Sequence, residues 1–148
     1  MYDQPRAHFP QTSMTFEQML ERVRYEGAYP TRERAAVAVR QVLAALGRQL
    51  TGDERVDLAR CLPVEAALAL TASVPDGEPL TGWGFVKDLA ARTGATPATA
   101  RWDTGAVLAA VTRLTGPDLA ARIVHRLPTG YALLFGQAEL RRPEPAAA

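Results

Sequence analysis

The side chains best suited to acid–base, nucleophilic or metal chemistry are few in this sequence and stand far apart. His8 lies in a polar N-terminal segment, and His125 is expected at the end of a short helix beside Arg126. A zinc site needs three or four converging His, Cys or acidic ligands, and neither histidine has such neighbours at ligand spacing. A partly positive imidazole is favourable near a helix C-terminus, so we expect His125 to be a solvated helix-end residue.

Cys61 is the single cysteine of the chain. A nucleophilic cysteine needs a pKa lowered by a cation, a helix N-terminus or a paired histidine. Arg60 is adjacent, but Cys61 is predicted at a helix C-terminus, where the helix dipole opposes a thiolate. We therefore interpret Cys61 as a core residue. One cysteine also excludes an intrachain disulfide.

The acidic residues Asp53, Glu54 and Asp57 resemble a magnesium or acid–base cluster at first sight. Asp53 and Glu54, however, begin a predicted helix, where the dipole favours negative charge and Glu54 can complete a capping box with Thr51. Asp118 repeats that capping position later in the chain. The sequence has no phosphate-binding glycine loop, Gly-x-Ser-x-Gly elbow or His-Glu-x-x-His motif. It therefore predicts no enzyme, no metal site and no cofactor.

Positive charge is balanced by negative charge along the chain. Seventeen Lys and Arg residues face sixteen Asp and Glu residues, for a net charge of +1. This balance argues against a nucleic-acid-binding protein, because phosphate neutralisation supplies most of the affinity of such proteins. Five arginines surround the first predicted turn: Arg22, Arg24, Arg32, Arg34 and Arg40. Glutamates are interleaved with them, so we favour a solvated surface of ion pairs and keep a nucleic-acid-binding face as the alternative.

Length and composition indicate one ordered domain. The chain has 148 residues, of which 47% are apolar and 22% are charged, as in globular proteins. No run reaches the roughly 18 apolar residues of a membrane span, and the first 13 residues lack the apolar core of a signal peptide. We therefore expect a cytoplasmic protein that does not enter a membrane.

The elements that position these residues are predicted to be helices. A first helix, over about 15–26, combines a capping box from Thr15 to Gln18 with an apolar stripe at Phe16, Met19, Leu20 and Val23. The clearest amphipathic helix, about 32–48, begins after an N-cap at Thr31 and carries Ala35, Val39, Val42, Leu43, Leu46 and Leu50. A short third helix is expected to bear Val56, Ala59 and Leu62, and a fourth to run from Val64 to about Leu70.

The same order of signals recurs about 65 residues later. The matching segments are Gly27-Ala28-Tyr29-Pro30 with Gly94-Ala95-Thr96-Pro97, Val42-Leu43 with Val107-Leu108, Thr51-Gly52 with Thr115-Gly116, and Leu62-Pro63 with Leu127-Pro128. A helical unit whose apolar face is covered by a second copy explains this recurrence. The sequence thus predicts an all-α, pseudo-symmetric helical bundle of two tandem repeats, each of three to four helices.

The predicted organisation has five parts, and the two repeats form one compact domain. They are a flexible arm (1–13), repeat 1 (14–71), a linker (72–82), repeat 2 (83–136) and a disordered tail (137–148). We expect eight helices, with the long ones at about 32–48 and 97–113 crossing near a pseudo-twofold axis. Both Leu-Pro motifs should be architectural, with the leucine buried and the proline in a first helical turn.

These segments resemble a bacterial family known as domain of unknown function 2267 (DUF2267), whose members often carry the motifs in tandem. The first copy supplies Phe16-Glu17-Gln18-Met19-Leu20, Val42-Leu43, Thr51-Gly52-Asp53-Glu54 and Cys61-Leu62-Pro63; the second supplies Phe85-Val86-Lys87-Asp88-Leu89, Val107-Leu108, Thr115-Gly116-Pro117-Asp118 and Arg126-Leu127-Pro128. The resemblance covers roughly residues 14–136. Members of that family usually have a glutamine immediately before Leu-Pro. In this chain the position is Cys61 in the first copy and Arg126 in the second. The resemblance implies a helical fold and brings no catalytic residues.

Three functional hypotheses remain. We favour a non-catalytic interaction or regulatory module that binds a protein partner, or a second copy of itself, through a helical face. The candidate surface consists of the five arginines named above and Trp102. Trp102 lies on a different side of its predicted helix from the apolar stripe, and the interpretation we favour for it is packing in the core or between the repeats. The alternatives are a nucleic-acid-associated protein that uses the arginines, and an enzyme with a site between the repeats.

Overall fold

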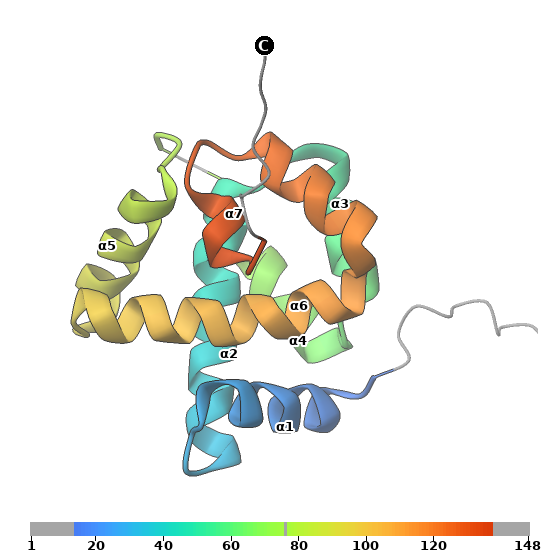
Figure 1. Cartoon of the computed structure of the whole chain (residues 1–148). Coiled ribbons are helices and arrows are strands. Elements are labelled where there is room, and N and C mark those ends of the chain that lie inside the picture. The colour runs from blue at the N-terminus through green and yellow to red at the C-terminus, as the bar shows by residue number, and fades with distance from the viewer. Residues whose placement is uncertain (1–13, 76, 138–148) are drawn as a thin grey trace, which may run out of the picture.

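The computed structural model describes residues 14–75 and 77–137, and all its regular structure is helical within those ranges (Figure 1). The predicted all-α class is therefore confirmed. The helices are α1 (Phe16–Gly27), α2 (Arg32–Gln49), α3 (Gly52–Cys61), α4 (Val64–Ala72), α5 (Gly82–Thr93), α6 (Pro97–Arg126) and α7 (Tyr131–Leu134). The predicted N-terminal arm, and all of the predicted tail except Gln137, lie outside the described residues.

The described residues form seven helical elements, and α6 contains both the predicted sixth and the predicted seventh helix, which meet at a kink. The junction is Gly116, whose φ of 80° and ψ of 166° are not helical, and Pro117 follows it. A left-handed φ is accessible to glycine at little cost, which lets the chain change direction there. The Thr115-Gly116 signal therefore marks the kink between the two helical segments of α6.

The helix starts follow the local signals closely in α1 and α2. The Thr15 hydroxyl accepts the Gln18 amide N–H at 3.1 Å, and the Gln18 side chain accepts the Thr15 amide N–H at 3.0 Å, which completes the predicted capping box. The Thr31 hydroxyl accepts the Arg34 amide N–H at 3.1 Å at the start of α2. Met19, Leu20 and Val23 are buried, as the stripe of the first helix predicts.

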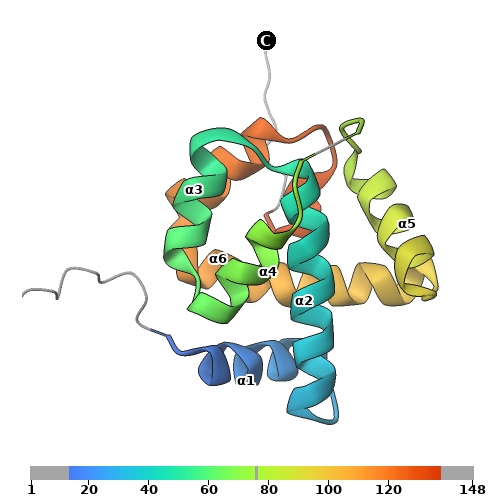
Figure 2. The same cartoon turned by 180° about the vertical axis from the view of Figure 1, so that it is seen from behind.

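The two long helices, α2 and α6, cross in the middle of the molecule (Figures 1 and 2). Their fully buried residues include Val39, Leu43, Val107 and Val111. The helix α1 packs along α6, so an N-terminal helix covers apolar surface of the C-terminal half. One continuous apolar core therefore joins both halves of the chain.

Helices α2 and α4 pack with their backbones in close contact. A Cβ atom added to Gly47 would lie 2.0 Å from the carbonyl oxygen of Leu70. The guanidinium of Arg55 caps this region by donating to the carbonyl oxygens of Gly47, of Leu50 at 3.1 Å and of Ser73 at 2.6 Å. Arg55 thus satisfies carbonyl groups that two helix ends leave without partners.

The start of α3 corrects two expectations. Thr51 is the N-cap but its side chain makes no capping hydrogen bond, so the predicted box with Glu54 is wrong. Gly52 enters the helix with a left-handed φ of 73°, and the Glu54 carboxylate pairs instead with Arg122 and Arg126 at 3.7 and 3.5 Å. Leu58, and not Val56, supplies the fully buried side chain of α3, and Val56 is 48% exposed.

The Leu-Pro motifs are confirmed at the leucines and corrected at the prolines. Leu62 and Leu127 are both buried, with 3% and 9% exposure. Pro63 is the N-cap of α4, one position before the expected first turn, because its ψ of 154° is extended. Pro128 lies in the loop before α7, whose N-cap is Gly130.

The local backbone of the two halves agrees at several paired positions. Ala28 and Gly94 end α1 and α5 with left-handed conformations, and Thr31 and Thr96 cap the long helices that follow. The last helices differ, since α4 has nine residues and α7 has four. A pseudo-twofold arrangement of the two halves stays a prediction.

Candidate functional site

A buried polar cluster joins the turn between α1 and α2 to the first turns of α6. The Tyr29 hydroxyl donates to Asp103 Oδ1 at 2.5 Å, and Arg34 Nη2 donates to Asp103 Oδ2 at 3.1 Å. Asp103 is only 5% exposed, so the Arg34 guanidinium supplies the charge that its carboxylate needs when buried. Arg34 also lies over the Tyr29 ring, 4.9 Å from its centroid. Burial, followed by the hydrogen bond to Asp103, raises the pKa of Tyr29.

Trp102 is the neighbour of Asp103 on α6, and its ring lies outside the core. Its indole Nε1–H donates to the carbonyl oxygen of Gly27 at 2.8 Å, which ties α6 to the last residue of α1. The side chain nevertheless stays 58% exposed. The prediction that Trp102 packs in the core is therefore wrong, whereas its hydrogen bond to Gly27 agrees with packing between the two halves of the chain. The hydrogen bond holds the ring in place while the aromatic surface faces solvent.

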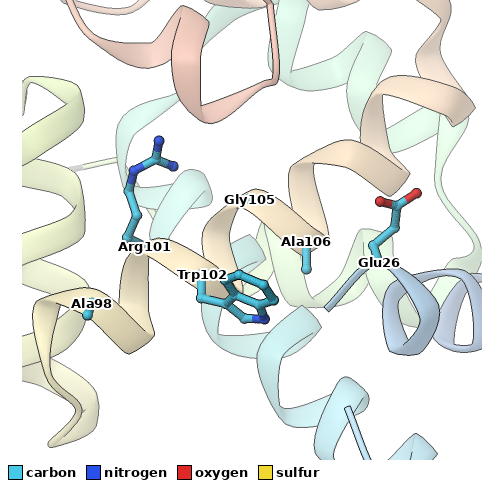
Figure 3. Close-up of a pocket in the computed structure, with 6 residues that line it drawn as sticks. All are labelled: Glu26, Ala98, Arg101, Trp102, Gly105 and Ala106. Carbon is cyan, nitrogen blue, oxygen red and sulfur yellow. The ribbon is translucent and has the colours of Figure 1, made fainter. Parts of the chain in front are cut away.

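An open depression of about 430 Å³ surrounds this ring. Its lining residues, shown in Figure 3, are Glu26, Ala98, Arg101, Trp102, Gly105 and Ala106. Three of them have small side chains or none, and a Cβ atom added to Gly105 would meet no other residue within 4 Å. We call this depression the Trp102 hollow. It combines a fixed aromatic ring with free space beside it.

Charged groups lie on two sides of the Trp102 hollow. Arg101 and Glu26 extend on opposite sides of the indole in the view of Figure 3. The Glu26 carboxylate pairs with Arg22 on the same helix at 3.8 Å. Arg101 is exposed and forms no ion pair with any described residue. One side of the hollow therefore carries a carboxylate in a long ion pair, and the other carries a guanidinium that has no carboxylate partner among the described residues.

The predicted arginine cluster is largely neutralised by carboxylates, as the interleaved glutamates indicate. Arg24 and Arg32 both pair with Glu21, at 3.1 and 2.9 Å, and these bonds lower the pKa of Glu21. Arg22 pairs with Glu26 and Arg34 with Asp103 as described above. Arg40 is exposed on α2 and makes no ion pair within the described ranges. The structure does not gather the five arginines into one free basic face.

The residues considered for metal or nucleophilic chemistry lie apart from the hollow. His125 is exposed in the last turn of α6, in agreement with a solvated helix-end residue. Cys61 is half-buried at the end of α3, where burial and the nearby charge of Asp57 raise the pKa of its thiol. Within residues 14–75 and 77–137, His, Cys, Asp and Glu form no group of three that could hold a metal ion. His8 lies outside the described residues.

A membrane-spanning helix is not found among the described helices, since none is both long and apolar enough to cross a bilayer.

The sequence patterns did not indicate the roles of four residues. Tyr29 and Asp103 form the buried cluster, Arg101 lines the hollow and Arg55 caps helix carbonyl groups. Tyr29 and Asp103 are 74 residues apart, and Arg55 and Ser73 are 18 apart, so no local spacing joins the partners. One signal was present, because Asp103 occupies the side of α6 that faces the core, as its neighbours Ala100, Val107 and Ala106 do. An acidic residue at such a position requires a cationic partner.

Comparison with known proteins gives one result that bears on this fold. No curated protein matches the chain. The model of the family described as "Uncharacterized conserved protein (DUF2267)" matches residues 16–134, which span α1 through α7 and include the Trp102 hollow. That match extends over most of the 148 residues. The chain therefore belongs to the DUF2267 family.

Proposed function

We propose that the protein is a non-catalytic interaction module that binds a protein partner through the Trp102 hollow. The observation that carries this proposal is the aromatic ring of Trp102, which is 58% exposed while its indole N–H is held by Gly27. Tryptophan is enriched among the residues that dominate binding energy at protein interfaces. The Trp102 ring can act in this way because its polar atom already has a partner.

Preorganisation of the ring supports the proposal. Binding usually costs the conformational entropy of the side chains that become ordered at an interface. The hydrogen bond from Trp102 to Gly27 already restricts the indole before a partner arrives. The free space beside Gly105 and Ala98 can receive an apolar side chain against the ring without moving backbone. The hollow therefore fits a partner that inserts an apolar group.

A nucleic-acid-binding role has less support on this surface. Four of the five candidate arginines pair with carboxylates of the chain, so a phosphate backbone would have to compete with them. An enzymatic role lacks a positive observation, since the candidate nucleophile Cys61 has a raised thiol pKa. We therefore base the proposal on Trp102 and not on the arginine cluster.

Site-specific photo-crosslinking tests the proposal. A photoreactive amino acid replaces Glu26, at the edge of the hollow, in the full chain and in cells that naturally produce the protein. In a matched variant it replaces Leu68 on α4. Leu68 is an exposed control position that does not line the Trp102 hollow. Its helix, α4, lies on the face of the molecule seen in Figure 2. We expect a discrete protein adduct from position 26 that disappears when Trp102→Ala is added. Absence of that adduct, or an adduct from position 68 alone, contradicts the proposal.

A further inference from the structure

We infer that the partner presents an acidic residue next to the apolar side chain that enters the hollow, with Arg101 binding the carboxylate. This inference rests on the proposed function and specifies the chemistry of the bound segment. It follows from the charges around the Trp102 hollow. The class of ligand it assigns is an acidic–apolar peptide segment of another protein.

Arg101 differs from most of the described arginines, because it forms no ion pair with another described residue. Arginines on α1, α2, α3, α5 and α6 form ion pairs, and Arg55 caps helix carbonyls. Arg101 is exposed, adjacent to Trp102, and pairs with no described carboxylate. An arginine guanidinium matches a carboxylate in bidentate geometry, so an exposed guanidinium beside an exposed aromatic ring favours an anionic group on the partner.

The far side of the hollow sets a direction for the bound segment. Glu26 lies on the other side of the indole from Arg101 in the view of Figure 3, and its carboxylate is paired with Arg22 at 3.8 Å, a long distance for an ion pair. A second acidic group on the partner would be repelled there, whereas an amide donor or a cation would be tolerated. The acidic residue should therefore lie at the Arg101 end, and the apolar side chain against Trp102, Gly105 and Ala98.

The matched control is Arg113, which lies on the same helix. Arg113 is exposed and likewise pairs with no described carboxylate, but it does not line the hollow. Reversal of charge at Arg101 and at Arg113 changes the net charge equally. Any difference between Arg101→Glu and Arg113→Glu therefore reports the local site and not long-range attraction.

The test is selection from a random peptide library displayed on phage, with the full chain as bait and Trp102→Ala as the subtractive control. An enriched peptide is then labelled and its affinity measured by fluorescence anisotropy. We expect the enriched sequences to share Asp or Glu beside an aromatic or large aliphatic residue. We expect Arg101→Glu to weaken binding by at least about tenfold, and Arg113→Glu by less than about twofold. Affinity should also fall with added salt.

The outcomes separate the two proposals. Peptides that require Trp102 but lack an acidic residue, or equal effects of Arg101→Glu and Arg113→Glu, overturn the acidic-segment inference and leave the interaction module standing. Failure to enrich any Trp102-dependent peptide overturns the proposed function as well. A labelled single-stranded oligonucleotide is titrated in parallel, and Trp102-dependent binding of that probe would overturn the peptide assignment.

Discussion

At the scale of single residues, two neighbours on α6 reverse the usual order of burial. Asp103 is 5% exposed and Trp102 is 58% exposed, although aspartate is normally at the surface and tryptophan is mostly buried. The turn between α1 and α2 explains both positions, because it brings Tyr29 and Arg34 to the carboxylate and the Gly27 carbonyl to the indole. The exposed ring is thus a consequence of specific contacts and not of loose packing.

The buried tyrosines should make the fold sensitive to alkaline pH. Burial raises the pKa of both Tyr29 and Tyr131 above the value of about 10 expected in the unfolded chain. Below that pH both states keep the proton. Above it the unfolded chain loses protons first, so the free energy of unfolding should fall as pH rises. Urea unfolding at pH 8 and near pH 11 measures this fall.

Tyrosine-to-phenylalanine variants assign the effect to the named residues. The double variant Tyr29→Phe/Tyr131→Phe should lose less stability at high pH than the wild type does. Tyr29→Phe should also cost about 1 kcal/mol at neutral pH, through the lost hydrogen bond to Asp103. Tyr25→Phe, at an exposed position, is the control. The account is contradicted if the free energy of unfolding of the double variant falls as steeply with pH as that of the wild type.

At the scale of helices, the two glycines Gly47 and Gly105 should respond in opposite ways to alanine. Gly47→Ala would place Cβ 2.0 Å from the Leu70 carbonyl oxygen, so α2 and α4 would have to separate. We expect a loss of at least about 2 kcal/mol, as for other overpacked contacts. Gly105→Ala meets open space and should gain about 0.5–1 kcal/mol from helix propensity. Chemical denaturation of both variants decides this, and a stable Gly47→Ala protein would rule out the close helix contact.

The Leu-Pro motifs give a second prediction at this scale. Leu62→Ala and Leu127→Ala should each cost about 2–5 kcal/mol, because both leucines are buried in the common core. The cost at Leu127 should be the smaller, since 9% of that residue remains exposed. Leu68→Ala, at a position 63% exposed on α4, should change stability by less than about 0.5 kcal/mol. If thermal melts give the three variants the same melting temperature, the Leu-Pro motifs do not support the fold.

Helix positions were predictable from the sequence where their signals are local. The capping threonines and the apolar stripes of α1 and α2 lie within a few residues of one another, and the structure confirms them. The start of α3 could not be predicted in this way, because the ion pairs that draw Glu54 away come from α6. The role of Arg55 was hidden for the same reason, since its acceptors lie at two other helix ends. The Trp102 hollow likewise forms only when α1 meets α6.

At the scale of the whole molecule, the two halves of the chain should fold as one unit. The helix α1 packs on α6, and polar contacts from Tyr29 to Asp103 and from Arg122 to Asp57 join the halves. The single apolar core extends through both. We expect one cooperative transition for the full chain, coincident by circular dichroism and by fluorescence. We also expect residues 14–75 alone to have little stable helix, and a cooperative melt of that fragment would contradict this prediction.

The central claim is that the Trp102 ring binds the partner, and quenching of its fluorescence tests this most directly. The chain has two tryptophans, so Trp83→Phe leaves Trp102 as the single emitter. The emission of Trp102 is measured with increasing acrylamide, with and without the partner found by crosslinking. We predict ready quenching in the free protein, and a blue shift with strong protection from acrylamide in the complex. A complex in which Trp102 is quenched as easily as in the free protein would contradict the account.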